Sequence, residues 1–219
     1  TKIFGDKLES VLMGITMVIS VILALGIFMV LPFFLTNLMK GFLPSYSIRT
    51  LIEGIIRVAL FLIYIWLISK MEDIKRVFMY HGAEHKTINC LEHGEDLTPE
   101  NIKKYSRLHK RCGTSFLLIV MIVSIVVFMF IRVDSLVWKF VLRILLVPVV
   151  AGISYEFIRL AGRSDSKIVN TLSKPGLYLQ YFTTREPDEE MMEVAIKAVE
   201  GVFDWREYLR AMHNGELED

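Results

Sequence analysis

Long uncharged apolar stretches alternate with polar segments along this chain of 219 residues. Residues 10–39 contain no charged side chain, and about 20 apolar residues are enough to cross the hydrocarbon core of a bilayer as a helix. A signal peptide is the competing interpretation of this first stretch, but its apolar region would extend over only about 7 to 15 residues. The pattern predicts four transmembrane helices, over residues 11–36, 51–69, 113–131 and 136–158.

These helices predict an all-α integral membrane protein in four parts. Residues 1–69 carry the first two transmembrane helices, and residues 70–112 form a polar loop. Residues 113–160 carry the third and fourth helices, and residues 161–219 form an amphipathic helical tail.

The tail is expected to lie at the membrane surface and to form helices. Leucines and aromatic residues between positions 172 and 182 favour the headgroup layer, where aromatic rings with polar tips are enriched. An amphipathic helix is expected to begin at Pro187 or Asp188, because acidic residues follow in its first turn. The spacing from Asp204 to Glu207 is that of a capping box and predicts a last short helix.

Charged residues interrupt the second and fourth predicted transmembrane helices. Glu53 and Arg57 are four residues apart, so they can pair along one helix face and hide each other's charge from lipid. Lys139, Arg143 and Glu156 make the fourth helix the least lipid-like. We therefore expect this helix to face other helices or a polar cavity.

Basic residues are concentrated in the polar loop, which contains Lys70, Lys75, Arg76, Lys86, Lys103, Lys104, Arg107, Lys110 and Arg111. The turn between the first two helices contains only Lys40 and Arg49. Because lysine and arginine favour the cytoplasmic side, the loop is expected in the cytoplasm, and with four spans so are both termini. The polar loop and the Glu156 end of the fourth helix would then share one membrane face.

The composition supports a membrane protein and excludes several other classes. The chain is 53% hydrophobic and 22% charged, and its mean hydropathy is +0.47, which is unusual for a soluble domain. The net charge of +1 comes without a basic block interleaved with aromatic residues, so nucleic-acid binding is not expected. Both cysteines lie in the polar loop, where a disulfide framework is not expected and a reducing compartment is acceptable.

The polar loop contains four of the five histidines and both cysteines. It opens with the pattern H-x-x-E-H, formed by His81, Glu84 and His85, which on a helix places the two histidines one turn apart on one face. It closes with His109 and Cys112, three residues apart. Both pairs have the residue types and spacing of metal ligands.

The stretch between the two pairs predicts how they meet. The apolar pattern of the second helix continues to His81, which predicts that this helix projects from the membrane. A helix-start signal at Thr98 and Pro99 predicts a helix over residues 101–108, which would return the second pair to the membrane. Cys90 and His93 fall in a turn-like stretch and are expected to be bystanders.

An open, catalytic zinc site is one interpretation of these residues. Zinc takes nitrogen and sulfur ligands in a tetrahedron, and a catalytic site leaves one position for a water that the metal acidifies. His81 and His85 with one further ligand would leave that position open, and Glu84 would be the general base, as in the inverted zinc-protease motif. The candidates for the third ligand are His109, Cys112 and Glu156.

Two further interpretations remain open. If both histidines and the pair of His109 and Cys112 all bind, the site is a closed structural clip and Glu84 supports a histidine ligand. Without metal, the histidines would be hydrogen-bonded at a helix interface. Cys112 is expected among the ligands wherever metal is bound, because a thiolate is a strong zinc ligand. Gly82 counts against a regular helix, since glycine costs about 1 kcal/mol in a helix interior.

Four segments resemble the YqhQ-like family of bacterial multi-pass membrane proteins, namely RVFMYHGAEHKTINCLEHGEDLTPENI, SRLHKRCGTSFL, AGISYEFIRLAGR and KPGLYLQYFTTREPDEEMMEVAIKAV. The resemblance covers almost the whole chain and implies a bacterial cell membrane location. Its members are of unknown function and are described as predicted metal-dependent enzymes. The family's polar signature falls on His81, Glu84, His85, Glu92, His109, Arg111, Cys112, Gly113 and Thr114.

The chain departs from the family pattern at two places. Lys110 stands where the resemblance implies a proline, which affects no candidate ligand. Members usually begin with a further glycine-rich soluble segment, so this chain, which starts at Thr1 close to the first span, is expected to be a fragment.

Two functional hypotheses follow from the sequence. The first is a zinc-dependent hydrolase of unknown substrate, embedded in the bilayer and acting at its cytoplasmic face. The second is a non-enzymatic scaffold, channel or assembly factor that forms homo-oligomers or binds another membrane protein. In the second hypothesis the loop is a structural clip or a docking surface.

Overall fold

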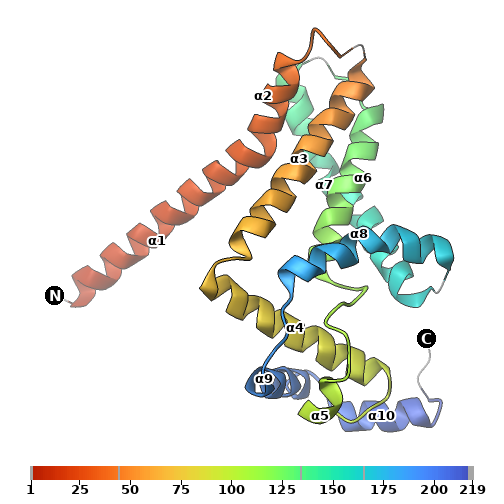
Figure 1. Cartoon of the computed structure of the whole chain (residues 1–219). Helices are drawn as coiled ribbons and strands as arrows, with labels where there is room; N and C mark the ends of the chain where they lie inside the picture. Colours follow the sequence, from red (N-terminus) through yellow and green to blue (C-terminus); the bar gives the residue numbers. More distant parts are fainter. Residues whose placement is uncertain (1, 44, 134, 165, 217–219) are drawn as a thin grey trace. The chain divides into compact units, whose positions relative to one another are not determined.

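The computed structural model describes residues 2–43, 45–133, 135–164 and 166–216, and all regular secondary structure among them is helical (Figure 1). The elements in chain order are α1 Lys2–Leu25, the π-helix η1 Gly26–Val30, α2 Leu31–Leu38, α3 Tyr46–Ile68, α4 Glu72–Glu92, α5 Pro99–Ile102, α6 Gly113–Phe130, α7 Leu136–Arg163, α8 Lys167–Thr183, α9 Glu189–Glu200 and α10 Trp205–His213.

Four segments are long and apolar enough to cross a membrane. They are Leu8–Leu38, Tyr46–Ile68, Gly113–Phe130 and Val137–Arg163. Their large apolar side chains are widely exposed, for example Met17 at 71%, as expected for contact with lipid. The predicted all-α class with four membrane-spanning helices is therefore confirmed.

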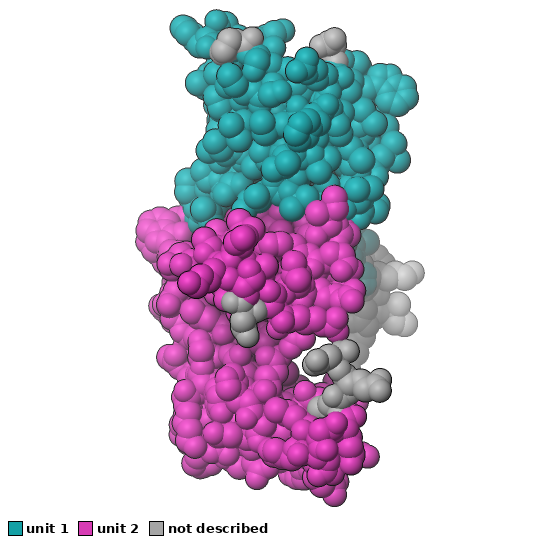
Figure 2. All heavy atoms as spheres, turned by 90° about the vertical axis from the view of Figure 1, so that its right-hand side faces the viewer, with its two compact units in different colours: residues 1–63, 121–150 teal, residues 64–120, 151–219 magenta. Residues whose placement is uncertain are grey.

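The chain divides into two compact units, which are coloured separately in Figure 2. Unit 1 comprises residues 1–63 and 121–150, and unit 2 comprises residues 64–120 and 151–219. Helices α3, α6 and α7 each begin in one unit and end in the other.

In unit 1, the predicted pair of Glu53 and Arg57 is confirmed, with an Nη2 to Oε1 distance of 3.1 Å. Arg57 also donates through Nε to the carbonyl oxygen of Phe28, at 3.0 Å. In an α-helix this carbonyl would accept from residue 32, but Pro32 has no N–H. The arginine thus donates to a carbonyl within the π-helix η1.

The core of unit 2 lies where α4 packs against α5, α9 and α10. Its buried apolar residues are Ala83, Cys90, Leu91, Leu97, Ile102, Met191, Met192, Val199, Trp205 and Leu209. The predicted starts of the tail helices are confirmed. The Asp188 side chain accepts from the N–H of Met191, and the Asp204 side chain accepts from the N–H groups of Arg206 and Glu207.

Helix α8 buries its small and polar face and exposes its aromatic one. Ser173, Gly176, Gln180 and Thr183 are buried, whereas Tyr178 is 63% exposed. This distribution is what a helix at a membrane surface requires. The location of α8 at that surface stays a prediction.

Two predictions about the polar loop are wrong in detail. The predicted helix over 101–108 ends at Ile102, because the chain beyond it is held by other contacts. The Asn89 side-chain amide donates to the carbonyl oxygens of Ser106 and Leu108, at 2.7 and 3.1 Å. In addition, a turn at residues 69–71 separates α3 from α4, so His81 does not lie on an extension of the second span.

Candidate metal site

Helix α4 places His81 and His85 one turn apart, as predicted, with His85 buried and His81 half-buried. Gly82 between them is a regular helical residue, contrary to the expectation that it opposes a helix. The segment after α8 crosses α4 here, and Arg185 donates its N–H to the carbonyl of Phe78 at 2.8 Å. A Cβ on Gly82 would lie 2.0 Å from the Arg185 carbonyl oxygen. This close approach, rather than backbone flexibility, requires glycine.

Cys112 joins the two histidines from the extended segment that precedes α6. Its Sγ lies 3.3 Å from His81 Nε2. The candidate ligand atoms of His81, His85 and Cys112 all lie within 4.8 Å of one another. Among the described residues this is the group that could hold a metal ion, and we call it the histidine–cysteine site.

Two backbone carbonyls orient the imidazole rings of the histidine–cysteine site. His81 Nδ1 lies 2.7 Å from the carbonyl oxygen of Thr183, and His85 Nδ1 lies 2.7 Å from that of Arg107. A carbonyl oxygen can only accept, so each Nδ1 carries a proton. Nε2 is then the ring atom toward Cys112: it donates to the thiolate when the ring is protonated, and it offers its lone pair to a metal ion when the ring is neutral. Metal-binding histidines in proteins are commonly held in this way.

The surroundings of Cys112 favour its thiolate. Burial alone would raise its pKa, but hydrogen bonds from His81, His85 and Thr114 outweigh burial and lower the pKa from 9.0 to about 5. The pKa of His81 is raised, because the hydrogen bonds to Cys112 and to the Thr183 carbonyl outweigh the lowering by burial. Burial and nearby acidic groups raise the pKa of the other thiol, Cys90, to about 11.

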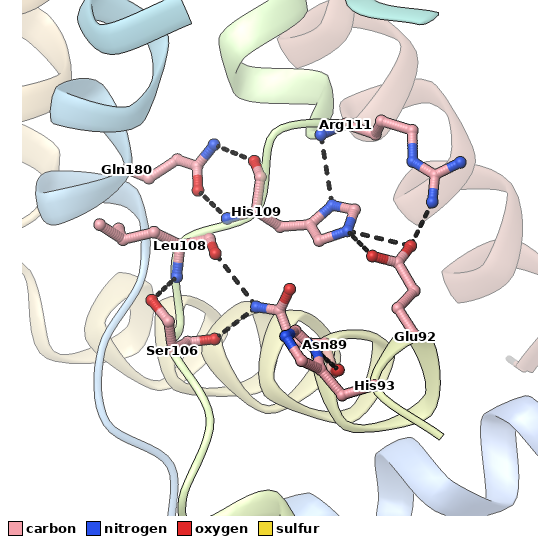
Figure 3. A network of polar contacts seen from close by, with 8 residues as sticks. All are labelled: Asn89, Glu92, His93, Ser106, Leu108, His109, Arg111 and Gln180. Carbon is pink, nitrogen blue, oxygen red and sulfur yellow. Dashed lines mark hydrogen bonds and ion pairs between the residues drawn. The ribbon is translucent and has the colours of Figure 1, made fainter. Parts of the chain in front are cut away.

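The structure places His109 outside the histidine–cysteine site, in a separate polar network (Figure 3). Its Nδ1 accepts from the backbone N–H of Arg111 at 3.3 Å, and its Nε2 donates to the Glu92 carboxylate at 3.1 Å. Arg111 pairs with the same carboxylate. Both ring nitrogens of His109 are therefore engaged, although its ring centroid is only 5.8 Å from that of His85.

The two predicted carboxylates also lie outside the histidine–cysteine site. Glu156 pairs with Arg159 one turn along α7 and is exposed. Glu84 is exposed on α4 and lines a mostly apolar groove of about 420 Å³ with residues of α9, including Val194 and Ala198. Its charge contributes to raising the pKa of His81.

Cys90 and His93 take no part in the histidine–cysteine site, as predicted. Cys90 is fully buried in the core of unit 2, and its thiol donates to the carbonyl oxygen of Asp96 at 3.7 Å. His93 Nδ1 donates to the carbonyl oxygen of Asn89, at 2.7 Å.

Sequence reasoning missed the residues of α8 that support the site. The Gln180 side chain is fully buried, accepts the N–H of His109 at 2.8 Å and donates to its carbonyl at 2.8 Å (Figure 3). Thr183 supplies the carbonyl that orients His81. Gly176, Gln180 and Thr183 are spaced by four and three residues, so they share one helix face. This spacing could have indicated a buried polar face of the helix.

The donor set fits zinc. Zinc bonds of about 2.0 Å to nitrogen and 2.3 Å to sulfur in a tetrahedron separate the two ligand atoms by about 3.5 Å. The 3.3 Å between Cys112 Sγ and His81 Nε2 is close to this value. Two imidazoles and one thiolate would leave one position for water or substrate, which is the arrangement of catalytic zinc sites.

Comparison with known proteins gives a family but no activity. Residues 2–205 match the model of a family described as "Protein of unknown function (DUF1385)". The chain is 41% identical over 182 residues to "Uncharacterized protein YqhQ" of Bacillus subtilis (strain 168). The match covers 83% of this chain but only 57% of that relative. No solved structure matches the chain.

Proposed function

Since this chain belongs to the DUF1385 family of proteins of unknown function, which the matches over residues 2–205 show, we propose its function from the chemistry of its site. It is a membrane-bound, zinc-dependent hydrolase in which His81, His85 and Cys112 hold the ion. The relative of 41% identity is itself uncharacterised, so the substrate does not come from the comparison.

One observation carries the proposal, namely that the site brings together three ligands and leaves out a fourth. His109 was the candidate that would have closed the site, and its ring nitrogens bind Glu92 and the Arg111 backbone instead. When bound, zinc at three protein ligands supplies an acidified water with a pKa near 7. The backbone carbonyls of Thr183 and Arg107 hold the rings for this role.

Glu84 is the proposed general base, although its carboxylate is exposed and is not one of the clustered ligands. It follows His81 by three residues on α4, which places both on one side of the helix, and its charge acts on the His81 pKa. The adjoining groove is lined by apolar side chains of α9. This lining favours a substrate with an apolar group.

The proposed orientation places the histidine–cysteine site at the cytoplasmic face. Its support is the excess of lysine and arginine in the polar loop over the turn between the first two spans. The proposal includes the bacterial cell membrane as the location, from the resemblance to bacterial relatives.

Metal analysis of the purified full chain in mild detergent tests the proposal. We expect close to one zinc per chain, and loss of that zinc in the double variant His81→Ala and His85→Ala and in Cys112→Ser. His109→Ala should retain it, because His109 is no ligand of an open site. A structural clip closed by His109 would instead lose metal in His109→Ala.

The chemistry is tested separately on Glu84→Gln, which should keep zinc. Hydrolysis of an activated ester such as p-nitrophenyl acetate should fall by about 100-fold or more, the usual effect of removing a general base. Zinc bound without any hydrolysis that depends on Glu84 would contradict the enzyme and favour a structural clip in a scaffold.

A further inference from the structure

A second polar cluster lies in unit 1, where four charged side chains of two membrane-spanning helices meet. Glu53 on α3 contacts Arg57 at 3.1 Å, Lys139 of α7 at 3.2 Å and Arg143 of α7 at 2.6 Å. The side chain of Glu53 is 3% exposed, and those of the three cations are 16%, 16% and 8% exposed. The sequence predicted only the pair along α3.

The charges of this cluster do not balance. Three cations surround one carboxylate, which leaves an excess of two positive charges among these described contacts. Uncompensated charge within a membrane span is costly, and such residues commonly mark ligand or ion sites. The excess therefore favours a bound anion.

A cavity adjoins the cluster and has room for such an anion. Its volume is about 60 Å³, and its lining residues are Phe33, Thr36, Asn37, Tyr46, Arg49, Thr50, Glu53 and Lys139. This is space for about four water-sized groups, comparable to the four oxygens of a phosphate. Glu53 also lines the cavity, but both of its oxygens already accept from cations.

A buried donor without a partner points to a ligand in this cavity. Thr50 is 4% exposed, and its Oγ1 is one of two buried polar side-chain atoms in the described chain that have no hydrogen-bond partner. A buried hydroxyl normally finds a partner, because leaving it unpaired costs about 1–3 kcal/mol. An oxyanion between Thr50, Arg49 and Lys139 would supply that partner.

The cavity lies near the ends of two membrane-spanning segments, which is where lipid phosphates are found. Thr50 lies four residues from the start of α3 at Tyr46, which is about 6 Å along the helix. Lys139 lies two residues from the start of the fourth span at Val137, which is about 3 Å along the helix. The headgroup layer on each side of the hydrocarbon core is about 6 Å thick.

We infer that unit 1 contains a binding site for a phosphate-class oxyanion, formed by Thr50, Arg49 and Lys139 beside the Glu53 cluster. The anion is either the headgroup of an anionic lipid or free phosphate. This site is independent of the proposed hydrolase, because all of its residues lie outside unit 2.

Native mass spectrometry of the full chain in neutral detergent tests the inference with three probes. The probes are dioleoyl phosphatidylglycerol, inorganic phosphate and dioleoylglycerol, which lacks the phosphate. Wild type should retain one phosphatidylglycerol or one phosphate, but no dioleoylglycerol. Thr50→Val should weaken that binding about tenfold, the effect of one lost hydrogen bond to a charged group. Thr50→Ser should preserve it.

Two controls separate loss of the ligand from loss of the fold. Thr50→Val removes a hydroxyl that is unpaired without ligand, so the melting temperature of the ligand-free protein should stay the same or rise. Thr16→Val on the exposed side of α1 should change neither binding nor melting, since its hydroxyl only donates to the Leu12 carbonyl.

The retention pattern of the three probes identifies the ligand or rejects the site. Retention of phosphatidylglycerol alone identifies a lipid headgroup, and retention of inorganic phosphate identifies a free anion. Equal retention by wild type and Thr50→Val, or no retention of either phosphate probe, overturns the site.

Discussion

At the residue scale, the histidine–cysteine site owes its geometry to backbone carbonyls that accept hydrogen bonds from its two imidazole rings. The carbonyls of Thr183 and Arg107 fix both imidazoles with Nε2 toward Cys112. The thiol is thereby surrounded by donors and loses its proton easily. The pKa values of the two cysteines are therefore shifted in opposite directions, since Cys90 lies in an apolar core where burial raises its pKa.

The thiolate can be measured in the chelator-treated protein by its ultraviolet absorbance, taken as the difference between wild type and Cys112→Ser. A lowered pKa means that the thiolate exists above about pH 5. We expect the signal to be constant from pH 8 to 6 and to disappear as the pH falls through about 5. Cys90 should stay protonated throughout, because its pKa is about 11.

The change His81→Gln in the same titration tests the cause. Removing the imidazole should move the transition upward toward the ordinary thiol pKa, because a hydrogen bond from His81 lowers the pKa of Cys112. A transition that stays near pH 5 would show that His81 has no part in it.

At the element scale, the site depends on how closely the segment after α8 crosses α4. The crossing occurs at Gly82, where a side chain would collide with the Arg185 carbonyl. Thr183, the last residue of α8, comes immediately before this segment, and its carbonyl orients His81. The packing of this segment on α4 and the orientation of His81 therefore depend on neighbouring residues of the same stretch of chain.

Gly82→Ala should therefore destabilise the protein, although alanine favours helices by about 1 kcal/mol. The collision involves backbone, which cannot rotate away, so we expect a net loss of about 1–3 kcal/mol. Metal affinity should fall by about 10- to 100-fold, as when other groups that orient a ligand are disturbed. Thermal melting and zinc titration measure the two effects.

Gly113→Ala is the matched control for this change. Gly113 adjoins Cys112, yet a Cβ there meets nothing within 4 Å. Its melting and zinc affinity should match those of wild type. A stable Gly82→Ala protein with normal affinity would mean that the crossing is not required.

The elements show how far the sequence could predict the structure. The four spans follow from apolar length, and the tail helices follow from Asp188 and Asp204, because these signals are local. The prediction of a helix over 101–108 was wrong. The Asn89 side-chain amide, which is distant in the sequence, donates to the backbone carbonyls of Ser106 and Leu108. The local pattern contains no trace of that contact.

The candidate site was predictable in its residue types and only partly in its membership. His81 and His85 follow from helical spacing, and Cys112 was expected among the ligands. His109 was an equal candidate by spacing, but Gln180 holds its backbone and Glu92 holds its ring. Such competition between partners 71 and 17 residues away along the chain is decided by tertiary packing.

At the scale of the whole molecule, basic residues are distributed unequally between the two sides of the proposed membrane. The polar loop, residues 70–112, contains nine lysines and arginines, whereas Lys40 is the one basic residue of the turn over residues 39–45. This asymmetry predicts that the loop lies in the cytoplasm and the turn outside.

Cysteine labelling in intact cells with a membrane-impermeant maleimide tests that orientation. Phe42→Cys lies in the turn at a position that is 88% exposed, and Val202→Cys lies in the tail at one that is 81% exposed. We expect Phe42→Cys to be labelled in intact cells and Val202→Cys only after lysis. The native cysteines give little background, since both are buried. The reverse labelling pattern would contradict the orientation.

The contact between His81 and Thr183 joins positions 102 residues apart, and this separation has a consequence for biogenesis. While the chain is being synthesised, α4 and Cys112 are complete long before α8 is made. The carbonyl of Thr183 that orients the His81 imidazole is therefore absent until the chain has been synthesised beyond the third and fourth spans. Maturation of the site would then follow synthesis of α8, so that loading of the proposed metal ion would mark a chain whose synthesis has passed this helix.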